Sequence, residues 1–250
     1  MLEVIHLQKY FNKGTANEVE ALTDCSLVSA EGEFVVIIGA NGSGKSTLLN
    51  LVAGTNLPDK GKIFIDKQDV TFRKDFQRSK WIARVFQDPM AGTASELTII
   101  DNFRLAALRT KRKTFKTGIN EAFIKTVRNR LSTLNLGLEN KLNTVVGKLS
   151  GGQRQALTLL MAVMDDPKIL LLDEPTAALD PKSSELISEM ADDLIRQHTI
   201  TALLVTHNME YASKYGTRLI MMNQGKITID ISGEEKAKLT TDDLHRWFHQ

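Results

Sequence analysis

A glycine-rich stretch with one lysine is the first part of this sequence whose residue types point to chemistry. It runs from Gly39 to Thr47 and fits the pattern G-x-x-x-x-G-K-[ST]. Successive backbone N–H groups approach phosphate oxygens closely only where side chains are absent, and the tight curl needs positive φ at some positions. Gly42 and Gly44 meet both demands. Lys45 adds a positive charge, and a helix that begins there points its free N–H groups at the anion.

This loop predicts a nucleoside triphosphate site. The hydroxyl of Ser46 is a suitable ligand for Mg²⁺. The motif alone does not distinguish a kinase, a GTPase, a helicase or a transporter. We expect the whole loop to bind the nucleotide: Gly39, Ala40, Asn41, Gly42, Ser43, Gly44, Lys45, Ser46 and Thr47.

A pair of carboxylates follows an apolar run in the segment KILLLDEP. Asp173 and Glu174 come directly after four apolar residues. This places them at the carboxyl end of a buried strand, where open α/β sheets bind ligands. Asp173 is expected to hold the Mg²⁺ that bridges the phosphates. Neighbouring strand residues alternate in direction, so Glu174 is free to orient and deprotonate a water molecule. Such a pair favours hydrolysis over transfer to a hydroxyl.

A second glycine-rich segment opens another helix. It comprises Ser150, Gly151, Gly152 and Gln153. Free amides, a helix N-terminus and a serine hydroxyl make a second anion site. One chain therefore carries two phosphate-binding helix starts, and a single triphosphate does not obviously need both.

The elements that must position these residues alternate between strands and helices. Residues 33–39 form a continuous β-branched run, which suits a strand buried on both faces. Further strand and helix patterns follow after residue 150, and this alternation indicates a mostly parallel sheet with helices on both faces. Residues 2–11 and 21–29 predict an antiparallel N-terminal β part, and residues 61–70 predict one short strand.

The segment of about residues 88–150 has apolar residues at helical spacing and no strand pattern. We interpret it as an all-helical sub-domain inserted into an α/β core made of residues 1–87 and 150–232. The tail, residues 233–250, contains a short terminal helix that Thr240 or Thr241 caps. The chain is thus expected to be one domain, residues 1–250.

Bulk composition sets limits on location and partners. The net charge of +2 gives no reason to expect nucleic-acid binding. The single cysteine, Cys25, cannot form an internal disulfide, which suits a reducing compartment. No uncharged apolar run of about 18 residues occurs, so we expect no membrane span.

Several motifs together resemble a known family. In order they are GANGSGKST, VFQDP, LSGGQ, ILLLDEP, ALD and LLVTHN. The chain resembles the ATP-binding subunits of ABC transporters, from about Leu2 to Asp230. The resemblance implies a P-loop NTPase core and hydrolysis of ATP with Mg²⁺. It also implies a head-to-tail dimer in which the Ser150–Gln153 segment caps ATP bound to the other protomer.

The resemblance assigns further roles. Gln87 is similar to a glutamine that contacts Mg²⁺ and the attacking water. His207 is similar to a histidine that contacts the γ-phosphate and positions that water. Asp180 falls in a loop that communicates across the dimer. An aromatic residue near the end of the first strand stacks on adenine in the family, and both Phe11 and the adjacent Tyr10 fit that place, with Phe11 aligning best.

The resemblance also implies partners. We expect a second ATPase protomer, with a homodimer favoured over a paired paralogue, and transmembrane permease subunits, and we expect this chain to lie peripherally at the cytoplasmic side of the cell membrane. The motifs are most similar to those of bacterial importers of amino-acid-like or uncharacterised small solutes, which have a separate solute-binding protein. The alternative is a soluble ATPase of the same superfamily, for example in iron–sulfur assembly. Residues 104–130 hold nine Lys and Arg and one acid; either they face anionic headgroups or they form a solvated surface, which charge runs usually do.

Overall fold

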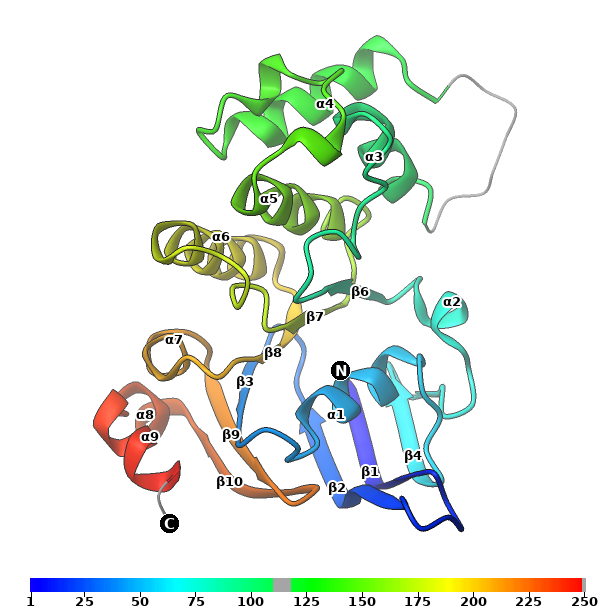
Figure 1. Cartoon of the computed structure of the whole chain (residues 1–250), viewed down its shortest axis with the longest axis vertical. Helices are drawn as coiled ribbons and strands as arrows, with labels where there is room; N and C mark the ends of the chain where they lie inside the picture. Colours follow the sequence, from blue (N-terminus) through cyan, green and yellow to red (C-terminus); the bar gives the residue numbers. More distant parts are fainter. Residues whose placement is uncertain (110–117, 249–250) are drawn as a thin grey trace.

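Two β-sheets form the framework of the molecule. The computed structural model describes residues 1–109 and 118–248. In these ranges the strands form a six-stranded sheet of order β10-β9-β3-β8-β7-β6 and a four-stranded sheet of order β2-β1-β4-β5 (Figure 1). In chain order the strands are β1 (Leu2–Phe11), β2 (Val19–Ser29), β3 (Phe34–Ile38), β4 (Lys60–Ile65), β5 (Gln68–Asp69), β6 (Ile82–Val85), β7 (Ile169–Asp173), β8 (Thr201–Val205), β9 (Arg218–Asn223) and β10 (Lys226–Ser232).

Helices connect the strands and pack on them. Among the described residues, none of the helices is both long enough and apolar enough to cross a bilayer. The helices are α1 (Lys45–Ala53), α2 (Asp75–Arg78), α3 (Ile99–Ala106), α4 (Glu121–Ser132), the 3₁₀ helices η1 (Leu138–Asn140) and η2 (Val146–Lys148), α5 (Gly151–Ala162), α6 (Pro181–His198), α7 (Met209–Lys214), α8 (Gly233–Ala237) and α9 (Thr241–Phe248).

The large sheet is parallel from β9 to β6, and β10 pairs with β9 in antiparallel fashion. Every residue of β3 and β8 is buried, as are the first four residues of β7. A strand whose two faces are both covered needs such a continuous apolar run. The predicted parallel sheet is therefore confirmed, and the antiparallel N-terminal part is the four-stranded sheet.

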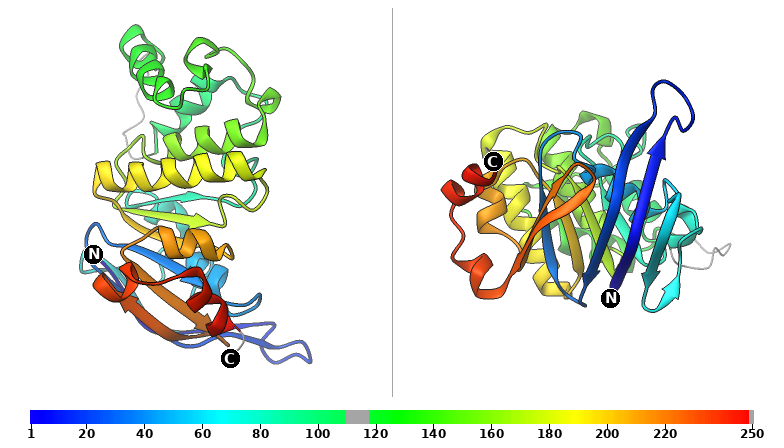
Figure 2. Two further views of the ribbon diagram at one scale, coloured as in Figure 1. Left: turned by 90° about the vertical axis from the view of Figure 1, so that its left-hand side faces the viewer. Right: turned by 90° about the horizontal axis from the view of Figure 1, so that it is seen from below.

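Alternate side chains of β3 enter two different hydrophobic cores. Val35 and Ile37 pack with the buried side of α1 and with the four-stranded sheet. Val36 and Ile38 pack with α5 and with the helices between β6 and β7. Because successive strand residues point to opposite faces, α1 and α5 cover opposite faces of the large sheet. The β1–β2 hairpin projects beyond the rest of the molecule in both views of Figure 2.

Helices fill the segment between β6 and β7 (Figure 1). In the described part of residues 88–150 the elements are α3, α4, η1 and η2, with one isolated bridge between Thr98 and Val145. The helical character expected for this segment is confirmed for those residues. Four members of the basic stretch lie outside the described residues: Lys111, Arg112, Lys113 and Lys116.

Residues 61–70 form a hairpin, so our expectation of one short strand was wrong. β4 and β5 pair antiparallel, and the turn between them has Asp66 at φ 49° and Lys67 at φ 63°. Two successive positive φ angles are typical of a type I′ turn, which asparagine and glycine usually occupy. The Asp66–Lys67 pair lacks that signal, and the turn is therefore hidden in the sequence.

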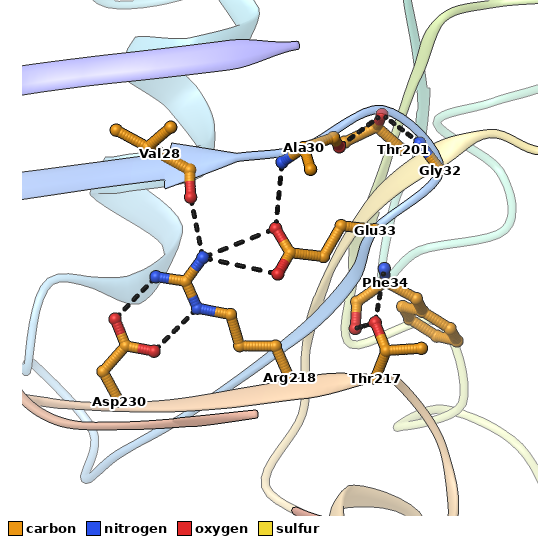
Figure 3. Close-up of polar contacts among 9 residues, drawn as sticks. All are labelled: Val28, Ala30, Gly32, Glu33, Phe34, Thr201, Thr217, Arg218 and Asp230. Carbon is orange, nitrogen blue, oxygen red and sulfur yellow. Dashed lines mark hydrogen bonds and ion pairs between the residues drawn. The ribbon is translucent and has the colours of Figure 1, made fainter. Parts of the chain in front are cut away.

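Arg218 ties the two sheets together (Figure 3). Its Nε and Nη2 atoms each donate to Asp230 over 2.6 Å, which joins β9 to β10. Its Nη1 atom donates to the carbonyl of Val28 in β2 over 2.7 Å and lies 3.4 Å from Glu33. A forked guanidinium can satisfy several acceptors at once, and here it holds one edge of the small sheet against the large one.

The C-terminal tail packs on α7. Lys236 is 3% exposed and donates from Nζ to the carbonyl of Ser213 over 2.7 Å. Burial lowers the pKa of its ammonium group. Thr240 caps the terminal helix, because its hydroxyl accepts from the N–H of Asp243 over 3.2 Å. The expected terminal helix is confirmed, with Thr240 as its cap.

Arg78 holds the C-terminal end of α1. The last carbonyls of a helix lack partners within the helix and attract cations. Arg78 is fully buried and donates to the carbonyls of Leu51 and Val52 over 2.6 and 2.8 Å, and also to those of Thr71 and Arg73. Burial lowers its pKa to about 10. Because α1 begins at the glycine loop, this contact fixes the helix that presents Lys45.

Arg78→Met should destabilise the protein, because it leaves several buried carbonyls without a donor. We expect the free energy of unfolding in urea to fall by about 2–4 kcal/mol. Lys74→Met, at an exposed neighbouring position, is the control and should change it by less than about 0.5 kcal/mol. Equal stability of the two variants would contradict the role of Arg78.

Candidate functional site

The glycine loop lies between β3 and α1. Gly42 and Gly44 have φ of 81° and 102°, which confirms that the curl needs positive φ. A Cβ atom on Gly44 would lie 2.7 Å from the carbonyl oxygen of Ala21, and one on Gly39 would lie 2.2 Å from that of Met222. At Gly39 and Gly44 both the torsion and the lack of space exclude a side chain, whereas at Gly42 the torsion alone does.

Lys45 lies inside this loop. Its Nζ atom donates to the carbonyls of Gly39 and Ala40 over 2.8 and 2.9 Å. Burial lowers the pKa of Lys45, while the charges of Glu174 and Asp173 act in the opposite direction. Asp173 and Glu174 thus lie close enough to act on the charge of Lys45, and groups predicted from two separate segments come together in one site.

Ser46 and Asp173 face each other. The Ser46 hydroxyl donates to Oδ1 of Asp173 over 3.3 Å. The other carboxylate oxygen of Asp173, Oδ2, accepts from Nη2 of Arg84 over 2.7 Å. A hydroxyl and a carboxylate oxygen 3.3 Å apart suit Mg²⁺, which is bound through few protein oxygens together with substrate phosphates. The donor set therefore fits the expected cation.

Glu174 follows Asp173 in an unusual backbone conformation. Its φ is 47°, and its N–H donates to the carbonyl of Val205 over 2.9 Å. Positive φ is uncommon for a residue with a long side chain and costs about 1–2 kcal/mol. This conformation directs the carboxylate out of the strand register. Nδ1 of His207 lies 3.1 Å from Oε2 of Glu174, so the predicted base and the predicted histidine are in contact.

Gln87 follows β6 and is exposed. The preceding residue, Phe86, is held by Gln155, a residue that the sequence motifs did not reveal. Gln155 is fully buried, and its Nε2 atom donates to the carbonyls of Phe86 and Pro175 over 3.1 and 2.8 Å. These carbonyls flank Gln87 and Glu174, respectively. The amide therefore fixes the backbone on which both predicted catalytic residues stand.

The second glycine-rich segment caps α5. The Ser150 hydroxyl accepts from the N–H of Gln153, and the Gln153 side chain accepts from the N–H of Ser150, over 3.2 and 3.1 Å. Ser150 and Gly151 are exposed. A Cβ atom on Gly152 would lie 2.7 Å from the hydroxyl of Ser183, so this segment packs closely on the start of α6.

Asp180 caps α6. The Asp180 carboxylate accepts from the backbone and the side chain of Ser183, which lowers the pKa of Asp180.

The two candidate aromatic residues for the adenine contact lie at the end of β1. The Tyr10 hydroxyl donates to Glu20 over 2.6 Å, and the centre of the Phe11 ring lies 5.6 Å from Nζ of Lys9. The choice between Tyr10 and Phe11 as the adenine contact stays open.

Comparison with known proteins finds relatives of the kind that the motifs indicate. A family model described as ABC transporter matches residues 22–177, more than half of the chain. The chain belongs to the ABC transporter family. A tyrosine transport ATP-binding protein of Clostridioides difficile (strain R20291) is 39% identical over 244 residues, which cover 98% of this chain and 97% of that protein. The methionine import ATP-binding protein MetN 1 of Yersinia pestis bv. Antiqua (strain Antiqua) is 32% identical, over 91% of this chain and 64% of that protein.

Solved ABC cassettes have the same fold. The dimeric cassette MJ0796, in a post-hydrolysis state with ADP and phosphate, is 30% identical with a TM-score of 0.79 and covers 93% of this chain and 98% of that chain. The ADP conformation of MJ1267 is 27% identical with a TM-score of 0.81, over 100% of this chain and 99% of that chain. As an ABC transporter subunit, the chain binds and hydrolyses ATP to drive transport, which confirms the resemblance drawn from the motifs.

Gln155→Leu tests whether the buried amide supports catalysis. The variant removes the donor from two carbonyls, so the backbone beside Gln87 and Glu174 loses its anchor, while the phosphate loop keeps its own contacts. We expect kcat for ATP to fall about tenfold or more, with a smaller change in KM, since orientation errors act on the chemical step.

The matched control is Gln197→Leu, at an exposed position on α6. It should leave both constants unchanged. A Gln155→Leu protein that is less stable but turns over ATP at the native kcat would show that Gln155 serves the fold alone.

Proposed function

We propose that two copies of this chain close head-to-tail on two ATP molecules and thereby drive import of an amino-acid-like solute. The permease is a separate membrane partner, and this subunit lies against it at the cytoplasmic face. The relatives named for tyrosine transport and methionine import support the solute class. The proposal includes a separate solute-binding protein, which the resemblance of the motifs to bacterial importers implies. Relatives named for transport disfavour the alternative of a soluble ATPase.

The observation that carries the dimer is the placement of two helix N-termini. α1 presents Lys45 on one face of the large sheet, and α5 presents Ser150 on the other face. Both ends have free N–H groups that attract phosphate. A triphosphate bound at the α1 loop therefore does not engage the Ser150–Gln153 segment of the same chain. That segment is available for a second nucleotide, which is bound to the partner protomer. The dimeric cassette MJ0796 supports this assembly.

The roles of the site residues follow from their positions. Backbone N–H groups of Gly39–Thr47 and the Lys45 ammonium bind the phosphates, and Phe11 or Tyr10 stacks on the base. Ser46, Asp173 and Gln87 would hold Mg²⁺, which would supply positive charge beside the triphosphate. Glu174 accepts a proton from the attacking water.

Two further residues complete this division of roles. The contact between His207 and Glu174 orients both groups toward the water. Because Nδ1 faces Glu174, Nε2 is the ring nitrogen left for the γ-phosphate, and it binds a phosphate oxygen by donating an N–H. Asp180 fixes the start of α6 next to the Ser150–Gln153 segment. Through this contact it couples closure of one nucleotide site to closure of the other.

The groove for the permease lies between an α/β core of residues 1–87 and 150–232 and a helical sub-domain of about residues 88–150. A cavity of about 190 Å³ opens there, and Leu105 on its wall is 53% exposed. An apolar side chain of the permease fits against Leu105. The rest of the lining combines small and apolar residues with the polar residues Arg84, Asn102, Arg109 and Thr158.

Glu174→Gln should stop turnover without preventing ATP binding. The amide keeps the shape and loses the base, so we expect kcat to fall about 100- to 10,000-fold. The variant should also form a more stable dimer with ATP, measured by size-exclusion chromatography. Glu185→Gln, on the exposed side of α6, is the control. Native turnover in Glu174→Gln would remove this residue from the role of base.

Mixing two inactive variants tests the shared site. Ser150→Ala keeps Lys45, and Lys45→Ala keeps Ser150, so a mixed dimer regains one complete site. We expect an equal mixture to recover about a quarter of the native ATPase sites, because half of the dimers are mixed and each repairs one site of two. Mixing Lys45→Ala with the Lys45→Ala/Ser150→Ala double variant restores no complete site and is the control. Equal activity of the two mixtures would refute the head-to-tail arrangement.

A further inference from the structure

Arg84 connects the two ligands proposed for Mg²⁺ to each other. It lies on β6, and its side chain is 13% exposed. Nη2 donates to Oδ2 of Asp173 over 2.7 Å, and Nη1 donates to Oδ1 of Asn50 over 2.6 Å. Asn50 and Ser46 are four residues apart on α1 and therefore share one face of that helix. The hydroxyl of Ser46 closes the ring by donating to Oδ1 of Asp173.

This ring fixes which oxygen of Asp173 faces the nucleotide. Arg84 engages Oδ2 and leaves Oδ1 beside the Ser46 hydroxyl. The guanidinium also lies 4.7 Å from the centre of the Phe86 ring, and a stacked guanidinium holding two acceptors has little rotational freedom. Its position is thus set by three separate contacts, and the carboxylate is oriented by it.

Arg84 also changes the charge that a metal ion meets. Ser46 is neutral, and the single negative charge of Asp173 is balanced by the positive charge of Arg84. The Asp173 side chain is 14% exposed, so solvent screens the pair only in part. Mg²⁺ gives up its water reluctantly and needs negative oxygen ligands. A pair with no net charge offers it little until a triphosphate brings several negative oxygens.

We propose that Arg84 is a positioning residue that orients Asp173 and makes divalent-cation binding at Ser46 and Asp173 depend on bound triphosphate. The cation then enters the site together with ATP, and the nucleotide-free subunit keeps its acidic residue paired. This inference rests on the proposed function, in which Asp173 is a metal ligand.

The test measures Mn²⁺ binding by electron paramagnetic resonance, with the native full-length chain and its variants. Native protein without nucleotide should bind Mn²⁺ only weakly at this pair, whereas Arg84→Met should bind it at least about tenfold more tightly, because a nearby like charge is removed. The gain should vanish in Arg84→Met/Asp173→Asn. Arg84→Lys keeps the charge and should behave as native protein.

Arg196→Met is the matched control. It breaks another arginine–aspartate pair, in which Nε of Arg196 lies 2.7 Å from Oδ2 of Asp192. That change frees a carboxylate to which no serine hydroxyl of the described residues donates, so it reports how much Mn²⁺ a freed aspartate binds without such a partner. It should bind no more than native protein does. An equal gain in Arg196→Met and Arg84→Met would overturn the proposal.

Two further results separate the inference from the function. In the first, native protein binds Mn²⁺ as tightly without nucleotide as with a non-hydrolysable ATP analogue, and the binding depends on Asp173. That result overturns the role of Arg84 and leaves Asp173 as a ligand. It is measured on native protein, so it does not depend on whether an Arg84 variant folds. If Asp173→Asn leaves Mn²⁺ binding with the analogue unchanged, the metal site of the proposed function is wrong, and the inference falls with it.

Discussion

The parallel pairing of β3, β7 and β8 is the constraint on which the whole site depends. Val205 lies opposite both Ile37 and Asp173, so the carboxyl ends of the three strands lie at the same level at one edge of the sheet. The glycine loop, Glu174 and His207 each follow within two residues of that line. A slip of one residue in any strand would send its side chains to the opposite face. The buried apolar runs that fix this register therefore also fix the catalytic geometry.

A few buried donors then hold the segments that leave this edge. Arg78 secures the far end of α1, Arg84 joins α1 to the end of β7, and Gln155 joins α5 to the backbone beside Glu174. Each donor reaches a carbonyl or carboxylate oxygen in a place poor in water. Such groups are costly to bury unpaired, so these contacts restrict the loops to one arrangement.

The sequence reveals the parts of the site that depend on local chemistry. The Gly39–Thr47 loop needs particular residues at particular torsions, and the capping of α5 by Ser150 is complete within four residues. Arg84 and Gln155 escaped notice because their partners lie far along the chain, and neither residue type is unusual in a strand or a helix. The Asp66–Lys67 turn escaped for a different reason, since tertiary pairing of β4 overrides the residue preference of the turn.

The contacts of Gln155 give α5 a physical link between two nucleotides. Ser150 at the start of α5 is the group proposed to meet ATP on the partner, and Gln155 lies five residues later, about 7.5 Å along the axis. Gln155 in turn holds the carbonyls of Phe86 and Pro175. A helix is stiff over so short a distance, so a shift of its first turn moves the backbone on which Gln87 and Glu174 stand. In the proposed dimer, contact with the ATP of one site would thereby bear on Gln87 and Glu174, the proposed catalytic residues of the other.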